Sequence, residues 1–355
     1  MPCAQCTSFK VPQLLIGERM LLSVPEVEMT HTLAAILERN QLAHQVDGTD
    51  FLIEGSAITS SLELLACGED LTEFQLSAIQ VLVLRDEEQL GLSTTRRSRT
   101  LLQVRQGLEH EDIAECLSSR RVVTYFQPLV DLSTDQIYGY EALARGVRVD
   151  GSVIAPNLLF DYAKANSAIF YLDRLTRETA IRTAAKRRLE HNIFINFMPN
   201  AIYDPKQCLK TTMAVSQEMN FDPARIIFEV IETESIGDMA HLHYILDYYR
   251  ERGYRVALDD VGSGYSSLNV LVDLKPDIIK IDREIIANLD RDTMKQSIFR
   301  GLTATAREHG IMVVAEGVET EGELNYAKEH GADLAQGFYF ARPLEDPPRS
   351  PTWRE

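Results

Sequence analysis

The 355-residue sequence has no apolar run that approaches the ~18–20 residues a helix needs to cross a bilayer. Its first residues also lack a basic start followed by an apolar stretch, which is the pattern of a secretory signal peptide. We therefore expect a cytoplasmic protein that does not associate with a membrane.

Cysteine is scarce and its number is odd. Five cysteines without a signal peptide argue against a disulfide framework. Cys3 and Cys6 form a single CxxC pair near the N-terminus. Because no second CxxC accompanies it, two free thiols are favoured over half a zinc site or a redox pair.

Positive charge is also in short supply, with 36 Lys and Arg against 53 Asp and Glu and a net charge of −17. The acidic excess is spread over the whole chain, whereas a general nucleic-acid binder presents a basic face. General nucleic-acid binding is therefore excluded. An acidic protein that handles a phosphate ester needs cations to do so.

The length suits one small domain followed by one of barrel size. Residues 1–86 predict a small α+β domain, in which Asp47-Gly48 suits the turn of a hairpin and Leu33, Ile36 and Leu37 share one helix face. Its expected strands cover 19–24 and 79–84, its helices 26–42 and 61–66, and its hairpin 44–55. We expect this domain to sense a signal or to drive association.

Residues 87–118 are polar and helix-prone, and they predict a helical linker. Leu101, Leu102, Val104 and Leu108 lie roughly on one face of it. This apolar stripe is suited to pairing with a second copy, so a homodimer is expected.

From residue 119 to about 345, short apolar runs recur, most of them followed by a segment of helical periodicity. Residues 346–355 are a tail. Eight such runs match a (β/α)8 barrel. They are residues 122–126, 137–140, 193–195, 226–228, 255–258, 278–279, 312–315 and 334–335.

The connection between the first two runs is little more than residues 130–136. Two parallel strands need a crossover of about a dozen residues or more. The first strand should therefore run antiparallel to the second, which predicts a modified TIM barrel.

Polar residues follow nearly every run, and the carboxyl ends of parallel barrel strands meet at one face. Any one of them is explained as a helix cap, but five carboxylates in one mouth repel each other by about 4 kcal/mol per close pair unless cations are present. Oxygen ligands and one amide suit two Mg²⁺ or Mn²⁺ ions, and the lack of His or Cys at a strand end disfavours zinc. The polar residues that follow the apolar runs are Glu141, Asn196, Glu229, Asp259, Asp260, Lys280, Glu316 and Gln336.

Several short sequence motifs occur in a fixed order at the spacing of barrel strands. They are Phe126-Gln-Pro-Leu-Val-Asp131, Tyr140-Glu-Ala-Leu143, Asp259-Asp-Val-Gly-Ser-Gly-Tyr-Ser-Ser-Leu268, Ile279-Lys-Ile-Asp282, Ala315-Glu-Gly-Val-Glu-Thr320 and Gln336-Gly-Phe-Tyr-Phe340. Over residues 119–345 this order resembles the EAL domain family, whose active members hydrolyse cyclic di-GMP to linear pGpG.

The resemblance implies a role for each matching position. Glu141, Asn196, Glu229 and Asp259 would hold one metal. Asp259 would bridge to the second, held also by Asp260 and by Glu316 or by waters that Glu319 and Gln336 position. Because Ca²⁺ prefers longer bonds and more ligands than Mg²⁺, we also expect it to inhibit. Glu141, Lys280, Glu316 and Asp260 would be catalytic, with Lys280 orienting the attacking water. Substrate or ordered water would contact Gln127, Leu143, Arg145, Asp282, Glu319 and Gln336, and Glu232 would position the loop 259–268 near a dimer interface.

Gly262 and Gly264 suit the tight backbone of that loop, although an ordinary turn explains each glycine alone. Lys164 stands where the family commonly has glutamate, which affects the guanine contacts rather than a metal ligand. Two other functions stay open: an inactive EAL module that binds cyclic di-GMP or a partner, and a metal-dependent barrel enzyme acting on a carboxylate substrate. An inactive EAL module typically lacks some of the metal ligands. A barrel enzyme acting on a carboxylate does not explain the ordered motifs.

Overall fold

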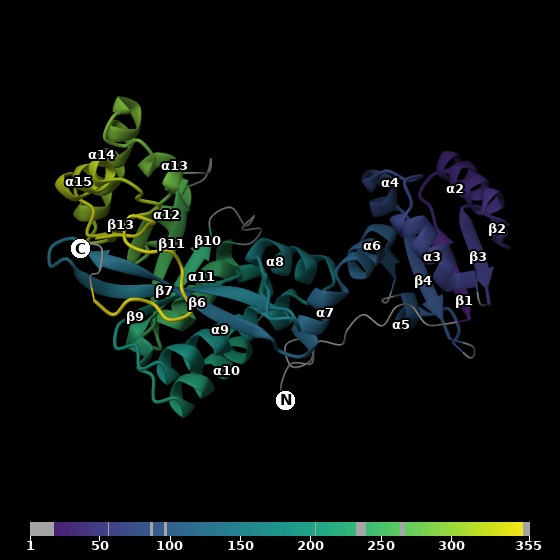
Figure 1. Ribbon diagram of the computed structural model, residues 1–355, viewed down its shortest axis with the longest axis horizontal. Helices are drawn as coiled ribbons and strands as arrows, with labels where there is room; N and C mark the ends of the chain where they lie inside the picture. Colours follow the sequence, from purple (N-terminus) through teal and green to yellow (C-terminus); the bar gives the residue numbers. More distant parts are fainter. Residues whose placement is uncertain are drawn as a thin grey trace.

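The structure is a computed structural model that describes residues 18–55, 57–85, 88–95, 98–202, 204–231, 239–262 and 267–350. Figure 1 shows a small N-terminal lobe beside a larger barrel. Cys3, Cys6, Glu232 and Gly264, to which the sequence assigned possible roles, lie outside the described residues. Within the described ranges, no helix has both the length and the hydrophobicity to cross a membrane.

The N-terminal domain is built on an antiparallel sheet whose strand order is β2-β3-β1-β4-β5. Alternate side chains of the sheet, including Met20, Phe51 and Val81, pack against its helices in one core. The predicted strands, helices and hairpin are confirmed. The elements are β1 (Arg19–Ser23), α2 (Val27–Arg39), β2 (Gln45–Asp47), β3 (Asp50–Glu54), α3 (Ala57–Cys67), α4 (Glu73–Ala78), β4 (Gln80–Leu84), α5 (Leu92–Thr95) and β5 (Arg99–Thr100).

The segment expected to be a linker forms two short helices, α6 (Leu101–Glu109) and α7 (Glu111–Ser118). Leu101 and Val104 are buried in the core of the N-terminal domain, and Leu102 and Leu108 are partly buried against it. The apolar stripe is therefore used within the chain. It does not offer the pairing surface that the sequence suggested, because the domain's own helices α3 and α4 pack against α6.

The barrel closes with eight strands, since β6 pairs with both β7 and β14. Both pairings of β6 are antiparallel, whereas the other barrel strands are parallel. The predicted modified barrel is confirmed. Its strands are β6 (Val122–Asp131), β7 (Gln136–Val147), β9 (Asn192–Phe197), β10 (Ile226–Ile231), β11 (Arg255–Val261), β12 (Ile278–Ile281), β13 (Met312–Ala315) and β14 (Leu334–Ala335), with β8 (Val153–Ile154) pairing on β7.

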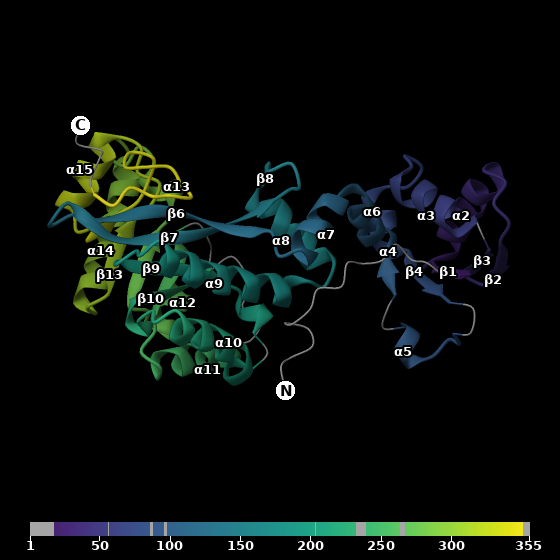
Figure 2. The same cartoon turned by 60° about the horizontal axis from the view of Figure 1, so that its bottom comes forward.

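Helices surround the barrel, and Figure 2 shows α9, α10 and α11 together on one side of it. A large core fills the space between the strands and these helices. The helices are α8 (Pro156–Ala165), α9 (Ile169–Lys186), α10 (Pro205–Glu218), α11 (Met239–Arg250), α12 (Ser267–Leu274), α13 (Arg283–Ile286), α14 (Thr293–Glu308) and α15 (Glu321–Glu329), with short 3-10 turns at Pro199–Ala201 and Pro223–Arg225.

Candidate active site

The interior of the barrel is closed by one layer of buried apolar side chains. Because side chains alternate along a strand, a residue two positions further on points into the barrel as well. In β10, Ile227 belongs to the apolar layer and Glu229 lies one step nearer the mouth. The same step leads from Phe194 to Asn196, Ala257 to Asp259, Ile278 to Lys280, Val314 to Glu316 and Leu334 to Gln336.

The antiparallel strand β6 reaches the same layer in reverse. Its apolar residue is Leu129, and Gln127 precedes it by two positions instead of following it. In the β6–β7 ladder Gln127 is paired with Glu141. The reversed strand therefore adds an amide beside the first carboxylate of the site.

Lys280 lies at the centre of the carboxylates and is almost completely buried. Burial alone would lower its pKa, but the surrounding carboxylates, led by Asp259 and Glu141, raise the pKa well above its ordinary value. The ammonium is therefore firmly protonated. Its Nζ lies 2.6 Å from Glu316 Oε1, 2.7 Å from Glu229 Oε1, 3.2 Å from Asp259 Oδ1 and 3.8 Å from Glu141 Oε2.

Asp259 and Asp260 are consecutive, and consecutive strand residues normally point to opposite faces. Here the β11–β12 register shifts between Leu258 and Val261, and Asp260 has a φ of 58°. This bulge with a left-handed residue lets both carboxylates approach Glu316. Burial, with Asp259 and Asp282 nearby, raises the pKa of Asp260 to about 6.

Gly262 completes this irregular strand end. Its φ is 107°, and a Cβ there would lie 2.9 Å from Ile285 Cγ1. A larger residue would be strained and would also crowd α13. The expectation of a special backbone conformation is confirmed for Gly262.

Glu141 is oriented by amides. Gln336 Nε2 donates to Glu141 Oε2 at 2.6 Å, and Asn196 Nδ2 donates to Glu141 Oε1 at 3.2 Å. Gln336 Nε2 also lies 3.1 Å from Gln127 Oε1, and Gln127 Nε2 donates to the Ala341 carbonyl at 3.1 Å. These bonds leave the carboxylate facing Lys280 and the other acidic groups.

The arrangement fits divalent cations. Oxygens of Glu141, Glu229 and Asp259 lie within 4.8 Å of one another, and so do those of Asp259, Asp260 and Glu316. Asn196 Oδ1 and Glu229 Oε2 are buried and accept no hydrogen bond from the described residues. Buried oxygens without donors are costly, so these two atoms suit coordination of a cation.

The electrostatics agree with that interpretation. Burial, together with neighbouring carboxylates, raises the pKa of Glu229 and of Glu316 well above the ordinary value, and Lys280 only partly opposes this. Five carboxylates share one ammonium in the described site. Hard oxygen ligands that are crowded in this way suit Mg²⁺ or Mn²⁺.

Of the cavities beside the acidic cluster, two are lined by most of the predicted contact residues. The larger cavity, about 890 Å³, is lined by Leu143 and Arg145 together with Glu141, Asn196, Asp259 and Asp260. The smaller, about 280 Å³, contains Asp282 and Glu319 together with Lys280, Glu316 and Gln336. The structure therefore brings every predicted metal ligand together and divides the remaining predicted contacts between two sides; their roles stay predictions.

The strand-end pattern missed the helical wall of the larger cavity. Phe160, Asp161 and Lys164 of α8 and Asp173 of α9 line it. The sequence singles out Lys164 only as a departure from the family pattern. The others could not be found by searching strand ends, because helices project them.

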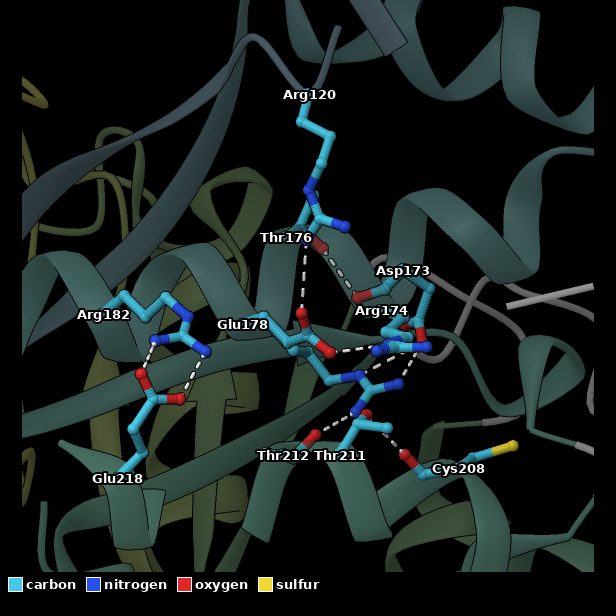
Figure 3. A network of polar contacts seen from close by, with 11 residues as sticks. Arg120, Asp173, Arg174, Thr176, Glu178, Arg182, Cys208, Thr211, Thr212 and Glu218 are labelled. Carbon is cyan, nitrogen blue, oxygen red and sulfur yellow. Dashed lines mark hydrogen bonds and ion pairs between the residues drawn. The ribbon is translucent and has the colours of Figure 1, made fainter. Parts of the chain in front are cut away.

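Asp173 also belongs to a buried network (Figure 3). Arg177 donates to Asp173 Oδ2 through Nε at 3.1 Å and Nη2 at 2.8 Å, and it also contacts Thr212. The Met198 amide donates to Asp173 Oδ1 at 3.1 Å. Since Met198 lies two residues after Asn196, this network fixes the chain that leaves β9.

We predict that Arg177→Leu destabilises the barrel by about 3–5 kcal/mol, because it leaves the Asp173 carboxylate buried and unpaired. Arg182→Leu on the same helix removes an exposed pair with Glu218 and should cost under about 1 kcal/mol. Urea denaturation of both variants measures the difference. Equal destabilisation would show that the buried pair carries no special weight.

An antiparallel first strand and a lysine-centred acidic mouth define a class: modified (β/α)8 barrels whose site suits divalent cations. The EAL domain family matches residues 110–343, about two thirds of the chain. The chain belongs to the EAL domain family.

Curated relatives share this region. The probable cyclic di-GMP phosphodiesterases PdeG and PdeB of Escherichia coli are 30% and 28% identical over 241 and 238 residues. Each alignment covers 66% of this chain but only 47% and 45% of the relative. The aligned part is thus less than half the length of these relatives.

Solved structures show the same barrel. A standalone EAL protein of Vibrio cholerae with c-di-GMP bound is 36% identical, covers 66% of this chain and 98% of its own, and has a TM-score of 0.60. The manganese and cy-diGMP complex of Klebsiella pneumoniae BlrP1 is 22% identical, covers 92% of this chain and 96% of its own, and has a TM-score of 0.58. The second likeness concerns the fold alone, and it extends into the N-terminal domain.

Proposed function

We propose that this chain hydrolyses cyclic di-GMP to linear pGpG with the help of two divalent cations, Mg²⁺ or Mn²⁺. The observation that carries the proposal is the pair of buried acceptors, Asn196 Oδ1 and Glu229 Oε2, inside a cluster of five carboxylates. An inactive receptor has no need to retain such a crowded set. The relatives named as phosphodiesterases support the substrate class.

The residues divide into two metal-binding groups with one shared member. Glu141, Asn196, Glu229 and Asp259 would hold the first cation, and Asp259, Asp260 and Glu316 the second. When bound, two such cations make a water molecule more acidic and stabilise charge on the attacking and leaving oxygens of the phosphodiester.

The chain's own groups do the positioning. Lys280 keeps its proton at Nζ, so it can orient the attacking water and offset charge on the phosphate. Gln336 Oε1 is buried without a donor among the described residues, which leaves an acceptor for ordered water. Arg145, in the larger cavity, would contact a substrate phosphate, and Glu319, paired with Arg283 at 2.8 Å, would place water on the other side.

Incubation of the purified chain with cyclic di-GMP and Mg²⁺ or Mn²⁺, followed by chromatography, tests the proposal. Release of pGpG supports the enzyme. Tight binding of cyclic di-GMP without cleavage would instead identify a receptor. If the chain neither binds nor cleaves cyclic di-GMP, the enzyme and the receptor are both ruled out.

We predict that Ca²⁺ inhibits. Calcium takes longer bonds and more ligands than Mg²⁺, so it can occupy the carboxylates while misplacing the water. Ca²⁺ should raise the melting temperature as Mg²⁺ does, yet yield no pGpG and abolish turnover when added in excess. Full activity in Ca²⁺ alone would contradict the prediction.

We further propose a homodimer whose barrel contacts run near the loop 259–268, with the N-terminal domain biasing them and Glu232 positioning the loop. Since α6 buries its stripe within the chain, the support that remains is that the segment 259–268 begins with two proposed metal ligands, Asp259 and Asp260, so a contact that shifts it would reach the site. The mass of the full chain in solution tests the dimer. A monomer at working concentration would remove it. The domain limits at 86, 118 and 345 likewise stay proposals, although β5 and α6, from the segment 87–118, pack with the N-terminal sheet and its core.

A further inference from the structure

One wall of the larger cavity packs against the segment that leads to the N-terminal domain. That wall is α8, which turns Phe160, Asp161 and Lys164 toward the cavity. Its buried residues Leu159 and Tyr162 pack instead with Ile113 and Leu117 of α7 in a separate core. One helix therefore contacts both the candidate site and the segment that leads to the N-terminal domain.

The nearest helix of the N-terminal domain, α6, lies against α8, as both views show (Figures 1 and 2). Gln103 of α6 donates from Nε2 to the carbonyl oxygen of Ala165, the last residue of α8, at 2.7 Å. A Cβ added to Gly107, one turn further along α6, would lie 3.9 Å from Asn166 Oδ1. The contact is thus close over a full turn.

Gln103 is also bonded within the N-terminal domain, through its side-chain oxygen and its backbone amide. Gln103 Oε1 accepts a hydrogen bond from the backbone amide of Thr100 at 2.9 Å. The backbone amide of Gln103 donates to Thr100 Oγ1 at 3.1 Å, and the two bonds form a capping box. Thr100 ends β5, which pairs with β4 of the N-terminal sheet. One side chain therefore joins the edge of that sheet to the end of the cavity wall.

We propose that Gln103 is a positioning residue for the cavity: by holding the C-terminal end of α8, it sets where Phe160, Asp161 and Lys164 meet the ligand. Ala165 directly follows Lys164, so a shift of this carbonyl moves the lining residues with it. Loss of the bond weakens binding of the ground state and of the transition state together. The inference rests on the proposed function for its ligand, cyclic di-GMP.

The test is Gln103→Glu in the full chain. Glutamate keeps the acceptor of the capping box, but it cannot donate to Ala165 and places negative charge at the negative end of α8. Gln75→Glu is the matched control, because Gln75 occupies the same position in the capping box of α4 with Thr72. Both variants add the same charge to the same domain.

Hydrogen exchange without nucleotide is the first measurement. In Gln103→Glu, the Asn166 and Ala168 amides, which donate to Tyr162 and Ala163 at 3.0 and 2.8 Å, should exchange about 3- to 10-fold faster. The control should not change them. Unchanged exchange in Gln103→Glu would overturn the proposal.

Steady-state kinetics is the second measurement. KM for cyclic di-GMP should rise about 3- to 10-fold while kcat changes less than about twofold, since uniform binding is lost. Faster exchange with an unchanged KM would also overturn the positioning role. If the wild-type chain neither binds nor cleaves cyclic di-GMP, the proposed function fails, and the exchange comparison still decides whether Gln103 holds α8.

Discussion

Glu141→Ala should remove turnover of cyclic di-GMP, by at least about 10²- to 10³-fold, while the barrel stays folded. A carboxylate that holds a catalytic cation contributes several kcal/mol to the transition state, and about 1.4 kcal/mol corresponds to tenfold in rate. Glu141 lies in the middle of β7, so it caps no helix whose loss would explain the defect. Release of pGpG in Mg²⁺, measured by chromatography, gives the rate.

Stability separates this effect from misfolding. Removing Glu141 loses the bonds from Gln336 and Asn196 but also relieves repulsion with Glu229 and Asp259. The metal-free variant should therefore melt within a few degrees of the wild type. Glu218→Ala, which removes an exposed partner of Arg182, is the control and should keep full activity. Near-normal turnover by Glu141→Ala would refute the assignment of Glu141 as a ligand.

Much of the barrel could be predicted because its signals are local. Short apolar runs gave the strands, and the brief connection after the first run gave its antiparallel direction. Strand ends gave the site, since the step of two residues from an apolar layer to a polar layer repeats around the barrel.

What the sequence could not predict depends on contacts between distant segments. The bulge that turns Asp260 beside Asp259 leaves no mark in the residue types, because two adjacent aspartates also suit an ordinary alternation. The apolar stripe of α6 was detected, but its periodicity is the same whether it packs on α3 and α4 or on a second chain.

The wall of the larger cavity was missed for a related reason. Asp173 and Arg177 are two of several charged residues in α9, and charged residues usually lie at the surface, yet both are buried. Only the tertiary structure brings α8 and α9 beside the strand ends. Site residues that strands contribute could therefore be predicted from the sequence, whereas those that helices contribute are identified only from the tertiary structure.

Lys280→Met should strongly destabilise the metal-free barrel. Lys280 is the one ammonium among five carboxylates of the described site, and removing one partner of a buried ion pair costs about 3–5 kcal/mol. For a barrel of this size that corresponds to a melting temperature lower by about 6–20 °C. Lys328→Met, which loses an exposed contact with Asp135, should change it little.

Divalent cations distinguish the structural role of Lys280 from its chemical one. Mg²⁺ supplies positive charge to the same carboxylates, so it should raise the melting temperature of Lys280→Met more than that of the wild type. It cannot replace the Nζ proton donor that we propose orients the water, so turnover should stay lost at saturating Mg²⁺. Calorimetry and pGpG release on the same samples measure both. If Mg²⁺ restores turnover together with stability, Lys280 serves only to neutralise charge, and its role in orienting the water is wrong.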